Sequence, residues 1–407
     1  MVTRALISLT FFALPWYVVR FTVFGLPTTL LEMVLLATLA VWLLDKARTR
    51  NFPTLNTQWR APIGLFLLAS IIALFTAPQF LPALGHWRAY ILEPILFALV
   101  LIDTIKTERD RTHVIYALAA SLVIPVAIAL YQQMTGLGIP EPFWAAEATR
   151  RVTSIYGYPN ALGLYAVPIL ILIIPQVIKS ESHSVIRLML VLVSCATIAA
   201  VVFTRSKGAL IALVAGIAVF FLLIARRKVL AAGALIVIAA IGIFVLKGSF
   251  NLRGIATVQG GDSVSVRLTQ YRETWEMLKD HPFTGAGLRG YQTAMAPYHA
   301  QKYIEIFMYP HNIFLTVWSE LGLIGLIAFV WVIIQFCKIS FHSTQLTNSQ
   351  THKLINYATI AAMSALLVHG FVDVPYFKND LAVLFWILIA FSIPLFTDRQ
   401  QLKNMLQ

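Results

Sequence analysis

Apolar runs of roughly 17 to 25 residues recur from one end of the chain to the other, and a helix of that length crosses a hydrocarbon core of about 30 Å. Lipid offers no hydrogen-bond partners to a peptide group, so each crossing must be a closed helix. Composition agrees, because 59% of the residues are hydrophobic and 12% are charged, against about 25% charged in a soluble domain. The sequence therefore predicts an all-α fold, a polytopic integral membrane helix bundle.

We expect about twelve transmembrane helices within one membrane domain, 1–407. Their expected ranges are 5–19, 27–44, 62–76, 89–104, 113–134, 158–178, 184–203, 207–225, 229–247, 312–336, 354–372 and 380–396. The short inner segments carry more lysine and arginine than the short outer ones, which predicts that both termini are cytoplasmic. The opening run lacks a small-residue cleavage site and is interpreted as the first helix.

The net charge of +13 does not indicate a nucleic-acid partner, because the lysines and arginines are distributed between the spans and form no separate basic domain. The two cysteines, Cys195 and Cys337, lie in or at the end of apolar runs, so no disulfide framework is implied.

Two expected outer segments, 135–157 and 248–310, are too long to be plain connections, and such loops usually carry function. Residues 263–281 of the longer loop predict a helix that Ser263 or Ser265 can cap. The residues expected on one of its faces are Arg267, Tyr271, Trp275 and Leu278. The alternative is an amphipathic helix that rests on the bilayer surface.

Positive residues are sparse, so those at outer helix ends need an explanation. The segment TRSKGAL holds Arg205 and Lys207 in a tight turn between two spans, where Gly208 would allow close backbone approach. The alternative for these two cations is snorkelling to the membrane interface.

A second group of cations, Arg150 and Arg151, precedes Pro159 and Asn160 at the start of a span. We expect Asn160 to cap this helix, whose N-terminus would favour an anion. The alternative is an ordinary loop that leads into a helix.

A third group consists of Arg267, Arg272 and Arg289, in the expected loop helix and the HPFTGAGLRGYQ segment after it. The nearby glycines are Gly285, Gly287 and Gly290. A glycine cluster without a strand before it is a weak phosphate-binding signal, so we predict no nucleotide site here.

A fourth group opens a later span, with His311 and Asn312 at its outer mouth and Glu320 a few turns inside. A carboxylate in the membrane is costly, so we expect Glu320 to face the bundle interior and to pair with a cation or polar group. Gly322 and Gly325 are expected to let a neighbouring helix approach closely.

These segments resemble the O-antigen ligase superfamily. HNIFLTVWSELGLIG, from His311 to Gly325, resembles the family signature of His, then Asn, Ser or Gln, nine residues, and Gly-x-x-Gly. TRSKGAL is similar to the family's Ser-Arg-Gly-type turn, with Arg205 in the matching position. RLTQYRETWEMLKDHPFTGAGLRGY and RVTSIYGYPNALGLY resemble the family's large periplasmic loop and the Pro-Asn start of a span. The resemblance covers about 151–325 and implies a GT-C-like fold in the bacterial inner membrane.

The resemblance implies an O-antigen ligase, which transfers a glycan from undecaprenyl diphosphate to a lipid A-core sugar hydroxyl at the periplasmic face. Arginine stays charged and grips phosphate oxygens, which suits Arg205 and Arg267 to the diphosphate. Histidine titrates near neutrality, which suits His311 to the acceptor proton. It could instead orient a phosphate oxygen. Candidates for binding substrate are Arg151, Asn160, Lys207, Arg272, Arg289, Asn312, Glu320, His369 and Asp373.

His369 and Asp373, four residues apart, could reach the same cavity, although core polar packing is an equal alternative. No Asp-x-Asp metal motif occurs, so we predict metal independence and no cofactor. Expected partners are the lipid-linked donor, the lipid A-core acceptor and membrane lipid, with no nucleic acid. A polysaccharide polymerase that uses the same donor is the nearest alternative. A transporter is less favoured, because its ionisable groups would lie near the midplane of two repeated halves.

Overall fold

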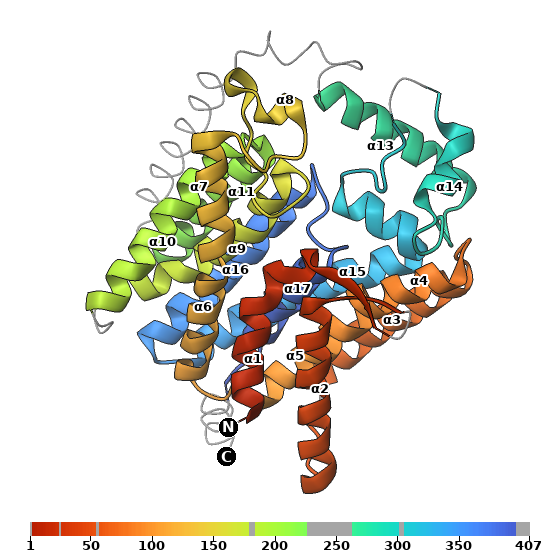
Figure 1. Cartoon of the computed structure of the whole chain (residues 1–407). Helices are drawn as coiled ribbons and strands as arrows, with labels where there is room; N and C mark the ends of the chain where they lie inside the picture. Colours follow the sequence, from red (N-terminus) through yellow and green to blue (C-terminus); the bar gives the residue numbers. More distant parts are fainter. Residues whose placement is uncertain are drawn as a thin grey trace.

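The computed structural model describes residues 2–23, 26–53, 57–178, 184–225, 263–300 and 305–395, and these are nearly all helical. In chain order the elements are α1 (Val2–Ala13), η1 (Leu14–Val18), β1 (Arg20–Val23), β2 (Leu26–Thr29), α2 (Leu30–Thr49), α3 (Thr57–Phe75), α4 (Phe80–Trp87), η2 (Arg88–Leu92), α5 (Glu93–Thr104), α6 (Glu108–Ser121), α7 (Val123–Thr135), α8 (Pro142–Ala145), η3 (Glu147–Thr149), α9 (Pro159–Ile178), α10 (Ser184–Phe203), α11 (Lys207–Ile224), α13 (Ser263–Asp280), α14 (Tyr291–Met295), η4 (Ala296–Tyr298), α15 (Ile313–Leu346), α16 (Gln350–Gly370) and α17 (Asn379–Ser392). Most of the long helices run side by side between two ends of one bundle (Figure 1).

Seven helices among the described residues are long and apolar enough to cross a membrane. They are Thr57–Phe75, Phe80–Thr104, Glu108–Thr135, Pro159–Ile178, Ser184–Phe203, Lys207–Ile224 and Ile313–Leu346. Helices α1, α2, α16 and α17 occupy four more of the expected positions but do not meet both conditions. The expected span at 229–247 lies outside the described residues. The presence of several helices that could span a membrane is thus confirmed, and the count of twelve stays a prediction.

A two-stranded hairpin corrects the all-α expectation near the N-terminus. Strands β1 and β2 pair antiparallel, with Arg20 opposite Thr29. Helix α2 then begins at Leu30, because the Thr29 hydroxyl accepts from the Glu32 N–H at 3.1 Å while the Glu32 carboxylate accepts from the Thr29 N–H at 3.0 Å. Four-residue strands within a long apolar stretch cannot be separated from helix by periodicity, so the sequence did not predict them.

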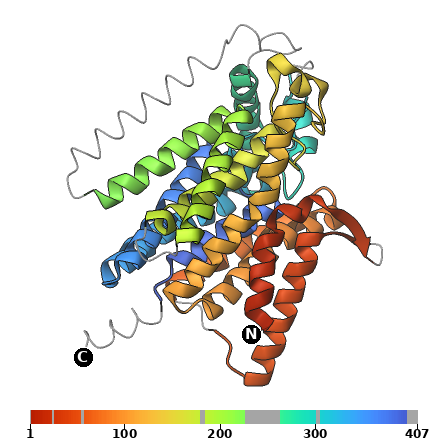
Figure 2. The ribbon, with the colours of Figure 1, turned by 60° about the vertical axis from the view of Figure 1, so that its left-hand side comes forward.

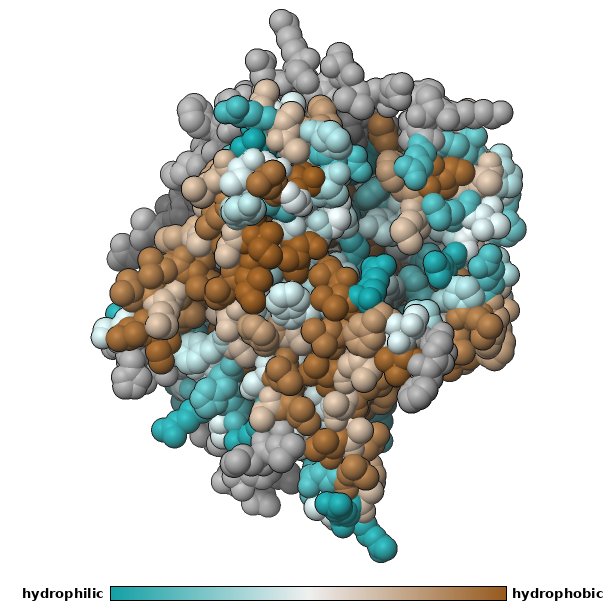
Figure 3. All heavy atoms as spheres, in the orientation of Figure 1, coloured by the Kyte–Doolittle hydropathy of each residue, from teal (hydrophilic) through white to brown (hydrophobic). Residues whose placement is uncertain are grey.

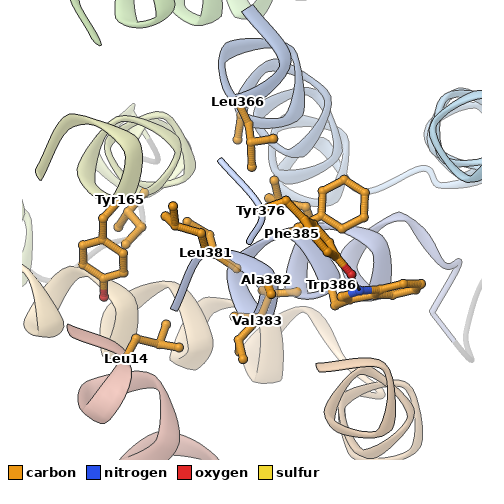
Figure 4. Packing of buried hydrophobic residues seen from close by; sticks show 14 of the residues in the cluster. Leu14, Tyr165, Leu366, Tyr376, Leu381, Ala382, Val383, Phe385 and Trp386 are labelled. Atoms are coloured by element: carbon orange, nitrogen blue, oxygen red, sulfur yellow. Dashed lines mark hydrogen bonds between the residues drawn. The ribbon is translucent and has the colours of Figure 1, made fainter. Parts of the chain in front are cut away.

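The centre of the bundle is formed by α9 and α17. Every described side chain of α17 is buried, and a helix that is apolar on all sides is stable only when other elements surround it. Figure 4 shows Phe385 and Trp386 of α17 packed beside Tyr376, with Leu366 of α16 and Tyr165 of α9 nearby. The Trp386 indole donates to the Tyr376 hydroxyl at 3.0 Å, which satisfies the polar atom of a buried ring.

The periphery exposes apolar side chains to what would be lipid. Helix α10 leaves most of its apolar face uncovered, and α1 and α2 stand as an adjacent pair at the edge of the bundle (Figure 2). Figure 3 shows a broad hydrophobic band across the middle of the molecule, with hydrophilic residues near its two ends. This distribution is typical of a protein that spans a bilayer.

The two described ends of the chain lie at the same end of the bundle. Arg4 of α1 forms an ion pair with Asp110 of α6 at 3.4 Å. Arg111, the next residue of α6, donates to the Ile393 carbonyl just beyond α17 at 2.6 Å. Both described ends therefore meet at the start of α6. Which side of the membrane they face stays a prediction.

The opposite end, which we call the α13 end, carries a small helical unit of α13 and α14. Met277 and Leu278 of α13 and Tyr291 of α14 are buried in a separate apolar cluster that also contacts Trp318 of α15. The helix expected over 263–281 is therefore present as Ser263–Asp280, and one of its faces packs against the protein. Contact of its other face with a bilayer surface stays a prediction. The side chains of 263–265 lie outside the described set, so the serine cap stays a prediction.

The segment after α13, Pro282–Gly290, is joined to a break in α15. Gly322 has φ 69° and ψ −178°, which interrupts the helix. The Leu323 N–H donates to the Pro282 carbonyl at 3.2 Å, and the Ser319 carbonyl accepts from the Ala286 N–H at 2.7 Å. Irregular backbone at this depth is tolerated because the loop supplies its hydrogen bonds.

The expectation that Gly322 and Gly325 let two helices approach is wrong. A Cβ on Gly322 would overlap the Phe283 carbonyl oxygen, so the close neighbour is a loop. The space beside Gly325 is filled by Leu321 of the same helix, because the break at Gly322 brings that side chain back.

Gly322→Ala is expected to lower the thermal unfolding midpoint in detergent. The left-handed φ alone costs a residue with a Cβ roughly 1–3 kcal/mol, and the overlap with Phe283 adds to it. Gly64→Ala in α3 is the matched control, because nothing lies within 4 Å of a Cβ there. Equal midpoints for the two variants would contradict the described break.

Candidate functional site

The mouth of α15 positions His311. The Asn312 side chain caps the helix, because its Oδ1 accepts from the N–H groups of Phe314 at 3.0 Å and Leu315 at 3.1 Å. His311 precedes this cap with φ 49°. Its ring lies between those of Phe307 and Tyr309, each at 5.1 Å and each edge-on. The imidazole is thus held in one orientation at the α13 end.

Asp373 is the polar partner of His311. It follows α16, its side chain is 1% exposed, and its Oδ1 lies 3.4 Å from His311 Nδ1. Its oxygens also accept from Asn160 Nδ2 and from the Val374 N–H, both at 2.9 Å. Burial alone would raise the pKa of Asp373, but the hydrogen bond and charge of His311, with the other donors, lower it to about 2. Asp373 therefore stays ionised at neutral pH.

Asn160 connects Asp373 to Arg151. Its Oδ1 accepts from Arg151 Nη2 at 3.3 Å, while its Nδ2 donates to Asp373. The expectation that Asn160 caps α9 is wrong, because α9 already begins at Pro159 and the Asn160 side chain extends between two charged groups. A neutral amide, with one donor and one acceptor end, suits that place.

Three arginines gather around this bridge. Arg151 donates from Nε to the Thr204 carbonyl at 2.9 Å, which fixes it against the turn that carries Arg205. Arg205 donates to the Ala148 carbonyl at 3.2 Å, so these described hydrogen bonds of the two arginines go to neutral oxygens. Burial, and then the charges of Arg267 and Arg205, lower the pKa of Arg151 to about 10. The α13 end thus concentrates positive charge.

Helix α13 brings Arg267 to this site. One turn after Arg267, the Tyr271 hydroxyl lies 3.0 Å from the His311 carbonyl and 2.8 Å from the Phe371 carbonyl. Residues four apart share a helix face, so Arg267 lies on the face that Tyr271 turns toward His311. Figure 1 shows α13 on one side of the segment between α16 and α17, with α7 and α8 on the other side.

The other candidate residues from the sequence are Lys207 and Arg272, and a separate pair of Arg289 and Glu320. Lys207 begins α11 two residues after Arg205, and Arg272 is exposed on α13. The Arg289 N–H donates to Glu320 at 2.5 Å, and the Arg289 charge acts on His86 and Tyr90, which places this arginine beside α4 and η2. Glu320 thus has its expected polar partner, in the form of a backbone N–H.

His369 lies inside the bundle. It is 2% exposed, and a Cβ on Gly208 would come within 3.0 Å of its Nε2. That nitrogen has no hydrogen-bond partner among the described residues. Of the two alternatives for the pair, the structure thus places Asp373 beside His311 and packs His369 of α16 against Gly163 of α9 and Gly208 of α11.

Left-handed backbone occurs at Arg205 and His311 of the site, and also at Arg289, which lies apart from them. Arg205, Arg289 and His311 have φ of 51°, 58° and 49°, a left-handed region that costs a residue with a side chain roughly 1–3 kcal/mol. Such conformations cluster at functional sites, where the surrounding structure enforces them. Three residues selected from the sequence for their chemistry therefore also have strained backbone.

Two parts of the site were not selected from the sequence. Tyr271 was assigned to a helix face but given no contact with His311. Lys378 donates to the Tyr158 hydroxyl, and neither residue was considered. The available signal was position, since Lys378 follows Asp373 by five residues and Tyr158 precedes Asn160 by two.

Comparison with known proteins supports the resemblance that the motifs carry. Residues 188–330 match a family model described as O-antigen ligase. The match includes Arg205, Arg267 and His311, and it stops before Asp373. No curated protein matches the chain. The resemblance to the O-antigen ligase and polymerase superfamily is thus confirmed over α10, α11, α13 and the start of α15.

Inorganic pyrophosphate is expected to raise the unfolding midpoint, because a bound anion relieves the repulsion among Arg151, Arg205 and Arg267. Arg267→Gln should weaken pyrophosphate binding roughly tenfold or more, the usual effect of losing a hydrogen bond to a charged group. Lys279→Gln on the same helix is the control, since Lys279 pairs with Glu276 at the surface. Equal effects of the two variants would count against an anion site.

Proposed function

We propose that this protein is an O-antigen ligase, which transfers a glycan from undecaprenyl diphosphate to a sugar hydroxyl of lipid A-core at the periplasmic face of the bacterial inner membrane. The observation that carries the proposal is the combination of the family match over 188–330 with His311 and three arginines at one end of the bundle. Family members are glycosyltransferase-like enzymes that act on lipid-linked sugars.

The acceptor hydroxyl needs a base. Asp373 approaches His311 Nδ1, which leaves Nε2 for the acceptor proton. The acceptor oxygen then forms a bond to the anomeric carbon as its proton passes to the imidazole. A permanently ionised Asp373 stabilises the imidazolium that results, as a buried carboxylate does beside a catalytic histidine.

The leaving group needs positive charge. When the bond between the anomeric carbon and the phosphate oxygen breaks, the electron pair remains on undecaprenyl diphosphate. Arg205 and Arg267 stabilise that charge together with Arg151, on which both of them act. Guanidinium groups supply this stabilisation without a divalent metal, which is why we infer a metal-independent reaction.

His311→Ala should lower transfer roughly 10²–10⁴-fold, the usual contribution of general-base catalysis. Asp373→Asn should also lower it, because the amide cannot stabilise the imidazolium. His281→Ala is the control, since His281 is exposed beyond α13. Purified variants with wild-type unfolding midpoints should be compared for glycan attached to lipid A-core. Wild-type turnover by His311→Ala would remove this residue from the mechanism.

The same assay distinguishes ligase from polymerase. The protein is given the lipid-linked donor with lipid A-core as the sole other acceptor. Glycan attached to the core supports the ligase, whereas longer lipid-linked glycan with an unmodified core would assign a polymerase.

Chelation by EDTA is expected to leave the transfer rate unchanged. Among the described residues, no group of three or more His, Cys, Asp or Glu side chains could hold a metal ion. Arginines are the residues proposed to bind the diphosphate of the donor. The rate is measured with EDTA and after readdition of Mg²⁺ or Mn²⁺. A loss of activity that either metal restores would refute metal independence.

A further inference from the structure

A second cationic group borders the site on the side of the β1–β2 hairpin. Lys378, which immediately precedes α17, places its Nζ 3.8 Å from the centre of the Tyr158 ring and donates to the Tyr158 hydroxyl. Both side chains are partly exposed. They join the segment before α9 to the segment before α17, next to the place where Asn160 of α9 contacts Asp373.

The group is continuous with His311. Tyr309 is 5.1 Å from the His311 ring, and burial, then Asp373 and Tyr90, raise the pKa of Tyr309. Arg20 of β1 lies opposite Thr29, whose N–H donates to Glu32, and Glu32 also accepts from Asn379, the residue after Lys378. The hairpin that carries Arg20 is thus joined to the start of α17, where Lys378 contacts Tyr158, two residues before the Asn160 that donates to Asp373.

The solvent-exposed part of this region carries a net positive charge. Arg88 is matched by two carboxylates, Glu32 at 3.3 Å and Glu93 at 3.4 Å, and Glu32 also accepts from Asn379 at 3.0 Å. Arg20 is exposed and belongs to no ion pair among the described residues. The carboxylate that acts on Lys378 is that of Asp380, which is 1% exposed.

Cations next to phenol rings suit one class of ligand, a sugar that carries an anionic group. A carboxylate or phosphate accepts charge-assisted hydrogen bonds from Lys378 and Arg20. Tyr158, Tyr90 and Tyr309 are partly exposed, and aromatic rings offer apolar surface to a sugar in mixed apolar and polar sites. Hydrophilic residues line the recess between the hairpin and α13 in Figure 3, so such a ligand can enter.

We propose that Lys378, Arg20 and Tyr158 form the acceptor subsite, which binds a sugar that carries a carboxylate or phosphate and holds a hydroxyl of that sugar next to His311. This proposal rests on the proposed function, since it gives the donor diphosphate to Arg151, Arg205 and Arg267. The arginines proposed for the donor and the cations proposed for the acceptor are next to different residues around His311 and Asp373. Donor and acceptor can therefore be bound at once.

Binding tests the subsite without any transfer reaction. Glucuronate, glucose 6-phosphate and uncharged glucose are titrated into the purified protein in nanodiscs, and binding is followed by saturation-transfer NMR. Both charged sugars should bind and compete, with glucose about tenfold weaker or more. Lys378→Met should weaken glucuronate about tenfold, whereas Lys378→Arg should retain it. Lys353→Met, near the start of α16, is the control.

The pH profile separates a binding role of Lys378 from a structural one. Burial lowers the pKa of Lys378 to about 8, with the Asp380 charge opposing and the Arg20 charge adding to this shift, and Tyr158 is the other titratable group in contact. A bound carboxylate keeps Lys378 protonated. Glucuronate affinity should therefore be constant below pH 8 and fall about tenfold per pH unit above it. In Lys378→Arg it should stay constant to pH 9.5, because guanidinium does not titrate there.

Three results would overturn the subsite: equal binding of glucose and glucuronate, wild-type affinity in Lys378→Met, or loss of glucuronate binding in Arg267→Gln with retention in Lys378→Met. Kinetics add a separate check. Lys378→Met should raise the KM for the acceptor and leave that for the donor unchanged, and Arg267→Gln should do the reverse. If no transfer to lipid A-core occurs but charged sugars still bind through Lys378, the ligase assignment fails and the subsite stands.

Discussion

The buried charge of Asp373 organises the α13 end of the bundle. A carboxylate removed from water is stable only when donors surround it, and here those donors come from three separate parts of the chain: His311 before α15, Asn160 in α9 and the Val374 N–H beside it. Each of these contacts fixes one element against the segment that leaves α16. The Asp373 carboxylate therefore positions His311, the candidate base, directly and Arg151 through Asn160.

Positive charge is in excess around that anion. Burial, and then the charges of Arg267 and Arg205, lower the pKa of Arg151, and the described hydrogen bonds of Arg151 and Arg205 reach neutral oxygens. Like charges that are held together in this way raise the free energy of the folded protein when no anion is bound. Binding of an anion would relieve this repulsion, so the stability lost by crowding would contribute to the affinity for an anionic ligand. The left-handed backbone at Arg205 and His311 is a second cost at the same place.

Local features of the structure were predictable from sequence, and contacts between distant segments were not. Helix α10 occupies the predicted 184–203, because an unbroken apolar run between polar ends determines a span. Because cations are sparse in the sequence, Arg205 and Arg267 were predicted as candidate site residues. Both are close enough to Arg151 to act on its charge. Asn160 looked like a cap because sequence shows only its neighbours in the chain. Its actual partner is 213 positions away, and neither hydropathy nor spacing encodes that distance.

The connection between Pro282–Gly290 and α15 determines when the site can be completed during synthesis. The loop emerges before α15, yet its carbonyl and amide partners at Ser319 and Leu323 belong to that later helix. Asp373 is made later still, after three arginines and His311 already exist. A nascent chain therefore carries the cations first and their buried counter-charge last. The contacts of the site are therefore complete only after the segment between α16 and α17 has been synthesised.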